Sequence, residues 1–366
     1  MEISRQNQTA GDNSCQLQAD NVGSITVVNG ITEQRAREIF REMNEVARRD
    51  YTSDAYELAL KRVSMFEELL MEKVQKVDGL LESFGDPAFQ FLLADAQRHA
   101  AASERENDYS MLTELLGCRV KHDSDRKIRT AISSAVKIVD EVDDDALCSL
   151  TVVYFFRRMV PLAGMCSEGL DCLEKYAKLF LQDKLAPNND WMEHLEILNA
   201  IRKIHFTAAP KFEEIFYNQL PGYVCVGIEK ESDTYSKAMS ILREAELPVE
   251  ILVDHELIDG YVRLPVTNIN QINELKLFDP QMRMYRPLYP NEITAIRKVW
   301  DLYSKDTNSL ALVKSRFMSE LENREYLKIL KTWWNKMPMN FEITKIGEVL
   351  AHANAQRLDN TIPALF

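Results

Sequence analysis

Glycine is scarce in this chain, with 12 glycines among 366 residues. No G-x-x-x-x-G-K or G-x-G-x-x-G loop occurs, so the backbone cradle that binds nucleotide phosphates is missing. The G-x-S-x-G elbow that exposes a nucleophilic serine is missing too. These absences argue against an NTPase and against an α/β-hydrolase.

Cysteine is also sparse, and its spacing suits neither disulfides nor zinc. The six cysteines form no C-x-x-C pair, and none lies at zinc-finger spacing from a histidine. We therefore predict reduced thiols, no metal site and no cofactor, as expected for a cytoplasmic protein. The longest apolar run, around Leu150 to Phe156, is far shorter than the roughly 20 residues of a membrane span. The first residues also contain no apolar signal region.

Positive charge is the minority charge. The chain has 44 Lys and Arg residues against 57 Asp and Glu residues, which gives a formal net charge of −13. Such a surface repels phosphate backbones and disfavours nucleic acid as a partner. With 46% hydrophobic residues the chain can bury a sizeable core, and its length predicts two domains with a small appendage.

Residues 1–30 differ from the rest in being polar and free of aromatic residues. Turn-forming clusters at 10–13, 20–23 and 29–30 divide this segment into short pieces. Between the turns, apolar side chains alternate with polar ones, which is typical of β-strands. The strand-facing apolar residues are Cys15, Leu17, Ala19, Ile25 and Val27.

A ribbon with so few apolar side chains is marginally stable alone in water. The segment can remain a flexible tail, add to an edge of its own body, or pair with another chain or another copy. We favour pairing, and therefore predict an oligomerisation segment at 1–30.

Residues 31–219 read as a helical domain. Thr32 can cap a helix that runs to about Arg49, and Asp86-Pro87 can begin another. Between them, apolar residues at steps of three and four predict a continuous helix over 53–84, about 48 Å long at 1.5 Å per residue. Further helices are expected at roughly 108–121, 124–141, 144–160, 162–183, 190–206 and 211–218.

Residues 220–290 read as a small α/β subdomain. Strand-like runs at 223–228, 249–253 and 261–266 accompany a helix near 233–246, and 279–290 reads as a linker loop. The region 291–366 returns to helices, with Asn291 as a predicted N-cap. The predicted fold class is therefore mainly α, with a hairpin-containing α/β insertion and a separate N-terminal β-prone segment.

Asp254, His255 and Glu256 form the best cluster of titratable groups. A carboxylate beside an imidazole can bind a metal or transfer protons. On a strand, however, Asp254 and Glu256 face one way and His255 the other, so the triplet does not converge by itself. We therefore interpret it as structural and retain it only as an acid/base or metal candidate.

The loop at 282–289 interleaves arginines with aromatic residues, a combination enriched in binding hot spots. Stacking and positive charge could also hold a nucleotide or a single strand. The alternative is a linker whose aromatics pack on the body. The candidate ligand or partner residues are Arg283, Tyr285, Arg286 and Tyr289.

Both ends of the chain resemble known proteins. Gly11-Asp12-Asn13-Ser14 with Gln18-Ala19 resembles the N-terminal tag of a group of poorly characterised bacterial proteins with a helical body. The stretch from Phe341 to Gly347, followed by Ala351-His352-Ala353-Asn354, resembles their ending, which is loosely similar to the abortive-infection protein Abi-alpha. The resemblance implies a bacterial intracellular protein in antiviral defence, and it carries over no catalytic residue.

The sequence thus favours a non-catalytic interaction protein that forms a homo-oligomer through residues 1–30 and docks on a protein partner. One alternative is a defence effector enzyme, a nuclease or toxin, with an unrecognised or inter-subunit active site. The other is a nucleotide-sensing regulator that uses the Arg/Tyr loop.

Overall fold

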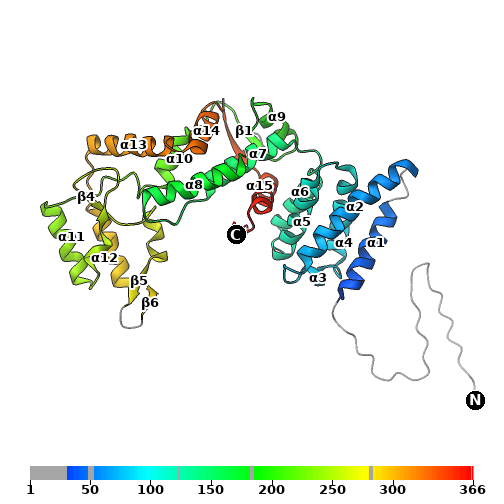
Figure 1. Cartoon of the computed structure of the whole chain (residues 1–366), viewed down its shortest axis with the longest axis horizontal. Coiled ribbons are helices and arrows are strands. Elements are labelled where there is room, and N and C mark those ends of the chain that lie inside the picture. Colours follow the sequence, from blue (N-terminus) through cyan, green and yellow to red (C-terminus); the bar gives the residue numbers. More distant parts are fainter. Residues whose placement is uncertain are drawn as a thin grey trace, which may run out of the picture.

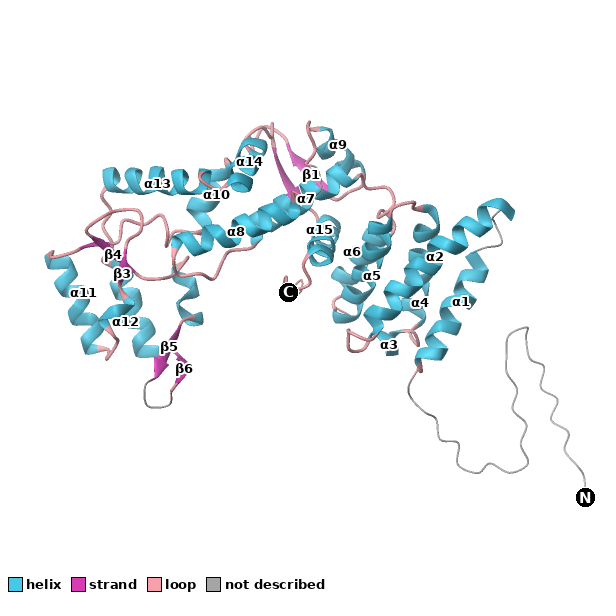
Figure 2. Ribbon diagram, in the orientation of Figure 1, coloured by secondary structure: helices cyan, strands magenta, loops and turns pink. Residues whose placement is uncertain are grey.

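The computed structural model describes residues 31–47, 53–122, 124–181, 185–279, 283–363 and 365. This part of the chain is mainly helical and carries three small antiparallel sheets, which confirms the predicted fold class (Figures 1 and 2). The predicted assembly segment at 1–30, with its residues from Cys15 to Val27, lies outside the described residues.

One end of the molecule is a group of packed helices. They are α1 (Glu33–Ala47), α2 (Ser53–Val74), α3 (Leu80–Ser83), α4 (Pro87–Ala102), α5 (Glu106–Lys121) and α6 (Arg126–Val136). Two predicted N-caps are confirmed, since the Thr32 hydroxyl accepts from the amide of Arg35 and the Asp86 carboxylate from that of Ala88.

The continuous helix predicted over 53–84 is wrong. Helix α2 ends at Val74, and a turn separates it from α3. Gly79 has φ 81° in that turn, a left-handed conformation that glycine adopts without steric cost. The apolar stripe still points inward on both sides of the break, because Leu70 and Leu80 are both fully buried.

The centre of the molecule brings together distant parts of the sequence. Its helices are α7 (Asp144–Arg158), α8 (Cys166–Phe180), α9 (Asp190–Ile197), α10 (Phe212–Gln219), α13 (Thr307–Glu322), α14 (Glu325–Trp334) and α15 (Lys345–Leu358). Helix α15 packs against α5, α6 and α7, so the C-terminal helix completes the core begun by the N-terminal helices (Figure 1).

The helix predicted over 190–206 is wrong in its second half. Helix α9 stops at Ile197, and strand β1 (Ile201–Ile204) pairs antiparallel with β7 (Asn340–Ile343). Asn199 ends the helix with φ 57°, and the amide of Ala200 donates to the carbonyl of Leu195. A partner strand about 140 residues away overrides the local helical pattern.

The start of α15 lies directly against the start of β1. The Thr344 amide donates to the Ala200 carbonyl oxygen at 3.0 Å. A Cβ atom on Gly347 would lie 2.1 Å from the same oxygen, so only glycine permits this approach. The sheet and the last helix are thereby fixed as one unit.

The opposite end is a smaller lobe with its own core (Figure 1). It contains β2 (Ile228–Glu229), α11 (Asp233–Glu244), β3 (Val253–Asp254), β4 (Tyr261–Arg263), β5 (Lys276–Asp279), β6 (Met284–Pro287), α12 (Pro290–Asp301) and 3₁₀ turns at Val249–Ile251 and Ile269–Glu274. The strand order is β2-β4-β3 in one sheet and β5-β6 in the other.

Two expectations in this lobe are corrected. The strand expected at 249–253 is mostly a 3₁₀ turn, and only Val253 and Asp254 pair with β4. Helix α12 is capped by Tyr289 rather than Asn291. Because Ala295, Ile296 and Val299 of α12 lie in the smaller core, that core extends past residue 290.

No helix in the described part of the chain is both long and apolar enough to cross a membrane.

Candidate functional site

Asp254, His255 and Glu256 do not share a site. The Asp254 side chain is 81% exposed and lies 2.7 Å from the Lys230 ammonium group. His255 is buried, where its Nε2 donates to the Cys225 carbonyl at 2.8 Å and its Nδ1 accepts from the Leu257 amide at 3.1 Å. Burial lowers the pKa of His255, so the ring is neutral at pH 7 and ties together two backbone segments.

Glu256 joins the smaller lobe to the central helices. Its carboxylate accepts from the amides of Cys166 and Ser167 at 2.6 and 3.1 Å, the first two residues of α8. A carboxylate there is stabilised by the free N–H groups and the dipole of the helix. Its Oε2 also lies 2.8 Å from the guanidinium of Arg263.

Arg263 is completely buried beneath this junction. It donates to the carbonyl oxygens of Gly164 and Leu264, and its guanidinium lies 5.5 Å from the centre of the Tyr223 ring. Tyr223 in turn donates its hydroxyl to the Ala163 carbonyl at 2.5 Å. Glu256 and Arg263 therefore form an ion pair of the smaller lobe that lies at the junction with α8, where both side chains also bond to backbone groups of residues 164–167.

The segment predicted as a linker at 279–290 contains a strand. Residues 276–279 and 284–287 form the β5–β6 hairpin, in which Phe278 pairs with Tyr285. Their rings meet edge to face with centres 5.5 Å apart. An Asp279-Pro280 step followed by a short apolar and aromatic run could have indicated a hairpin, and the connecting residues 280–282 lie outside the described residues.

This hairpin presents a group of large side chains to solvent, which we call the aromatic hairpin surface. Its members are Phe278 (54% exposed), Met284 (55%), Tyr285 (65%) and Tyr289 (54%). Sequence reasoning found both tyrosines but missed Phe278, which lies just before the range 279–290 that was predicted as a linker. Arg283 is exposed at the turn beside them, with φ 51°.

Arg286 holds one member of that surface, Tyr289, in place. Its guanidinium makes two bonds to the buried Glu292 carboxylate, at 2.8 and 2.6 Å, and lies 4.1 Å from the centre of the Tyr289 ring. The Arg286 hydrogen bond, followed by that from the Tyr289 amide, holds the pKa of Glu292 below its usual range. Arg286 therefore fixes Tyr289, and its charge is already matched.

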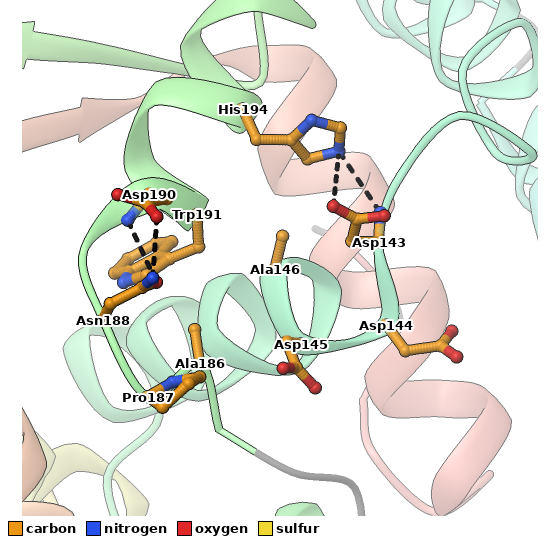
Figure 3. Close-up of a pocket in the computed structure, with 10 residues that line it drawn as sticks. All are labelled: Asp143, Asp144, Asp145, Ala146, Ala186, Pro187, Asn188, Asp190, Trp191 and His194. Atoms are coloured by element: carbon orange, nitrogen blue, oxygen red, sulfur yellow. Dashed lines mark hydrogen bonds and ion pairs between the residues drawn. The ribbon is translucent and has the colours of Figure 1, made fainter.

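A separate pocket of about 370 Å³ lies beside the N-terminus of α7 (Figure 3). Figure 3 shows Asp143 beneath His194, with Asn188 and Asp190 on the opposite wall. The Asp143 amide donates to His194 Nε2 at 3.2 Å. The helix expected to begin at residue 144 does so, with Asp143 at the N-cap and Asp144 and Asp145 in the first turn.

No three His, Cys, Asp or Glu side chains in the described ranges are grouped so as to hold a metal ion. The acidic side chains of this pocket lie at the N-terminus of α7, where the helix dipole stabilises negative charge. We assign the pocket no ligand.

A cluster of buried polar side chains lies between α7 and α15. Tyr154 hydroxyl and His352 Nδ1 are 3.2 Å apart, and Asn354 donates to the Thr151 hydroxyl at 2.9 Å. His352 is 1% exposed, and its Nε2 has no hydrogen-bond partner in the described structure. Burial, with smaller contributions from nearby cations, lowers the pKa of His352 to about 4.

Fold and surface together define an elongated, mainly helical protein with an exposed aromatic hairpin at one end (Figure 2). A family model matches residues 30–363, which is most of the chain, so the chain belongs to the family that this model describes. Neither a curated protein nor a solved structure matches the chain.

Proposed function

We propose that this protein is an interaction protein, which docks a protein partner on the aromatic hairpin surface and is multiplied into an oligomer by residues 1–30. The observation that carries the proposal is the exposure of Phe278, Met284 and Tyr285 on the β5–β6 hairpin and of Tyr289 just after it. Contiguous exposed apolar side chains mark binding surfaces, and tyrosine is enriched among their hot spots.

The contacts of Arg286 favour a protein over a nucleotide. A phosphate would have to compete with Glu292, whose two bonds already match the guanidinium fork. The net charge of −13 further disfavours a long phosphate backbone. What the hairpin offers is preordered aromatic area, because the ring of Phe278 meets that of Tyr285 and Arg286 stacks on Tyr289.

Replacing both Phe278 and Tyr285 with serine tests this surface. Proteins captured by the wild type are identified, purified and titrated individually against both forms. We expect the dissociation constant to rise at least tenfold in the double variant, since each ring is a candidate hot spot. Phe91→Ser is the matched control, because Phe91 is 76% exposed on α4 and lies outside the surface.

Equal affinity of a purified partner for wild type and double variant would reject the surface, as would failure to capture any partner. If the captured protein is a second copy of this chain, the surface mediates self-association, and the proposal of a different protein as the partner is rejected. The defence setting rests on the resemblance of the two chain ends, and phage plating on bacteria that express wild type or double variant tests it. Equal plating on expressing and non-expressing cells would contradict that setting.

Residues 1–30 supply the proposed assembly. Period-two alternation at 14–19 and 24–28 gives them strand character with too few apolar residues to fold alone, so they need an edge to pair with. Linking several weak sites raises avidity without new contacts. Deleting residues 1–30 is expected to convert a defined oligomer to monomers in light scattering. The same mass per particle with and without them would contradict the assembly role.

A further inference from the structure

An open pocket of about 590 Å³ lies where the end of α7 meets the β1–β7 sheet and the start of α15. Its apolar walls include Ile204, Pro210 and Ile343, and its polar walls include Arg157, Arg158 and Glu342. The sheet that forms it was missed by sequence reasoning, so this pocket has no counterpart among the predicted sites.

Arg157 is half-buried, and its partners differ from those of Arg263 and Arg286. Arg263 pairs with Glu256 and Arg286 with Glu292. Arg157 instead donates to the carbonyl oxygen of Phe341 at 2.9 Å and to the amide oxygen of Asn340 at 3.3 Å. Within the described residues, no carboxylate forms an ion pair with it.

Two aromatic rings lie close to the same guanidinium. Its central carbon lies 4.7 Å from the centre of the Phe341 ring and 5.6 Å from that of Trp334. These neutral contacts fix the group without cancelling its charge. Burial lowers the pKa of Arg157 to about 10, which leaves it charged at pH 7.

A partly desolvated cation without a counter-ion is costly, and an anion that enters the pocket relieves that cost. The hydrogen bonds to Phe341 and Asn340 occupy two of the five N–H donors of the guanidinium, so donors are left for a ligand. We infer that this pocket binds a small organic anion, whose carboxylate or phosphate group pairs with Arg157 while its apolar body lies against Ile204, Pro210 and Ile343. This inference is independent of the proposed hairpin surface.

The two acids of the pocket differ in their surroundings. The Glu348 carboxylate lies 2.7 Å from Arg158 and 2.7 Å from Lys345, so two cations share its charge. Glu342 lines the same pocket on an exposed position of β7 and opposes an anionic ligand through its charge. The two residues Arg157 and Glu342 should therefore have opposite effects on binding.

Phenyl phosphate and benzoate are suitable probes of this pocket, with benzyl alcohol as the uncharged control and sodium chloride to match ionic strength. Ligand-observed NMR on the full-length protein gives the dissociation constant. We expect saturable binding of at least one anion, a weakening of at least about tenfold in Arg157→Met, and a tightening of about two- to fivefold in Glu342→Gln. Arg98→Met, which changes an exposed arginine on α4, is expected to leave binding unchanged.

Benzoate binding alone identifies a carboxylate ligand, and phenyl phosphate binding alone identifies a phosphate ester. Binding of benzyl alcohol as tight as that of the anions would overturn the inference, as would unchanged affinity in Arg157→Met. If Arg157→Met fails to fold, Glu342→Gln decides the question, because an affinity equal to wild type would contradict an anion at this position. Absence of saturable binding by both anions would also overturn it.

Discussion

Glu256→Ala is expected to lower the free energy of unfolding by about 2–3 kcal/mol, less than for a fully buried ion pair because Glu256 is itself partly exposed. The substitution leaves the fully buried Arg263 without its carboxylate and removes the acceptor for the first two amides of α8. Urea denaturation at pH 7 measures the change.

Asp254→Ala is the matched control for that experiment. Asp254 is two residues away and carries the same charge, but its side chain is 81% exposed and its partner Lys230 is itself partly exposed. We expect a loss below about 0.5 kcal/mol, since exposed ion pairs contribute little. Equal losses in the two variants would contradict the junction role of Glu256.

The same carboxylate sets a pH dependence. Burial acts to raise the pKa of Glu256, but the hydrogen bonds from Cys166, Ser167 and Arg263 outweigh it and leave the pKa below the usual 4.5. A depressed folded-state pKa means that the stabilisation is present above the unfolded-state value and is lost as the pH falls through the folded-state value. Glu256→Gln should flatten the stability profile in that acidic range.

Protonation of His352 is expected to cost roughly 3 kcal/mol of stability between pH 6.5 and pH 4. The ring is buried, and its pKa falls from 6.5 to about 4 on folding. In that window the unfolded chain binds a proton that the folded chain does not, so stability decreases as the pH falls. The size of the loss follows from the pKa difference between the folded and unfolded chain, since each pKa unit corresponds to about 1.4 kcal/mol of stability.

Unfolding measured in urea from pH 7 to pH 4 tests this expectation, with His352→Gln as the variant. Glutamine can still offer a polar group to the Tyr154 hydroxyl but cannot titrate, so the variant should lose most of the slope between pH 6.5 and 4. His205→Gln is the control, because His205 lies exposed in the loop after β1. A wild-type slope retained by His352→Gln would show that other groups set the acid sensitivity.

The local helices were readable because their signals are local. The caps at Thr32 and Asp86 and the acidic start of α7 act within one helical turn, and the structure retains all three. The mainly helical class follows from the same periodicity, which depends on burial of one face and not on which element covers it.

The errors arose where a distant partner decides the local structure. Ile201 to Ile204 become a strand because β7 pairs with them, and the helix over 53–84 breaks where Gly79 adopts a left-handed turn. The linker predicted at 279–290 took in β6 and the end of β5, because β6 is short and ends in Pro287 and the turn before it begins with Pro280.

The sequence by itself determined the mainly helical class, the net negative charge and the two tyrosines at positions 285 and 289, since composition and short-range periodicity encode them. Only the tertiary structure separated Asp254, His255 and Glu256 into an exposed ion pair, a histidine bonded to two backbone segments and an ion pair at the junction of the two lobes. It alone also placed Arg157 in a pocket, with no ion pair to a carboxylate of the described residues, beside a strand from the other end of the chain. Burial and pairing of a charge depend on contacts between distant residues, which a single sequence does not specify.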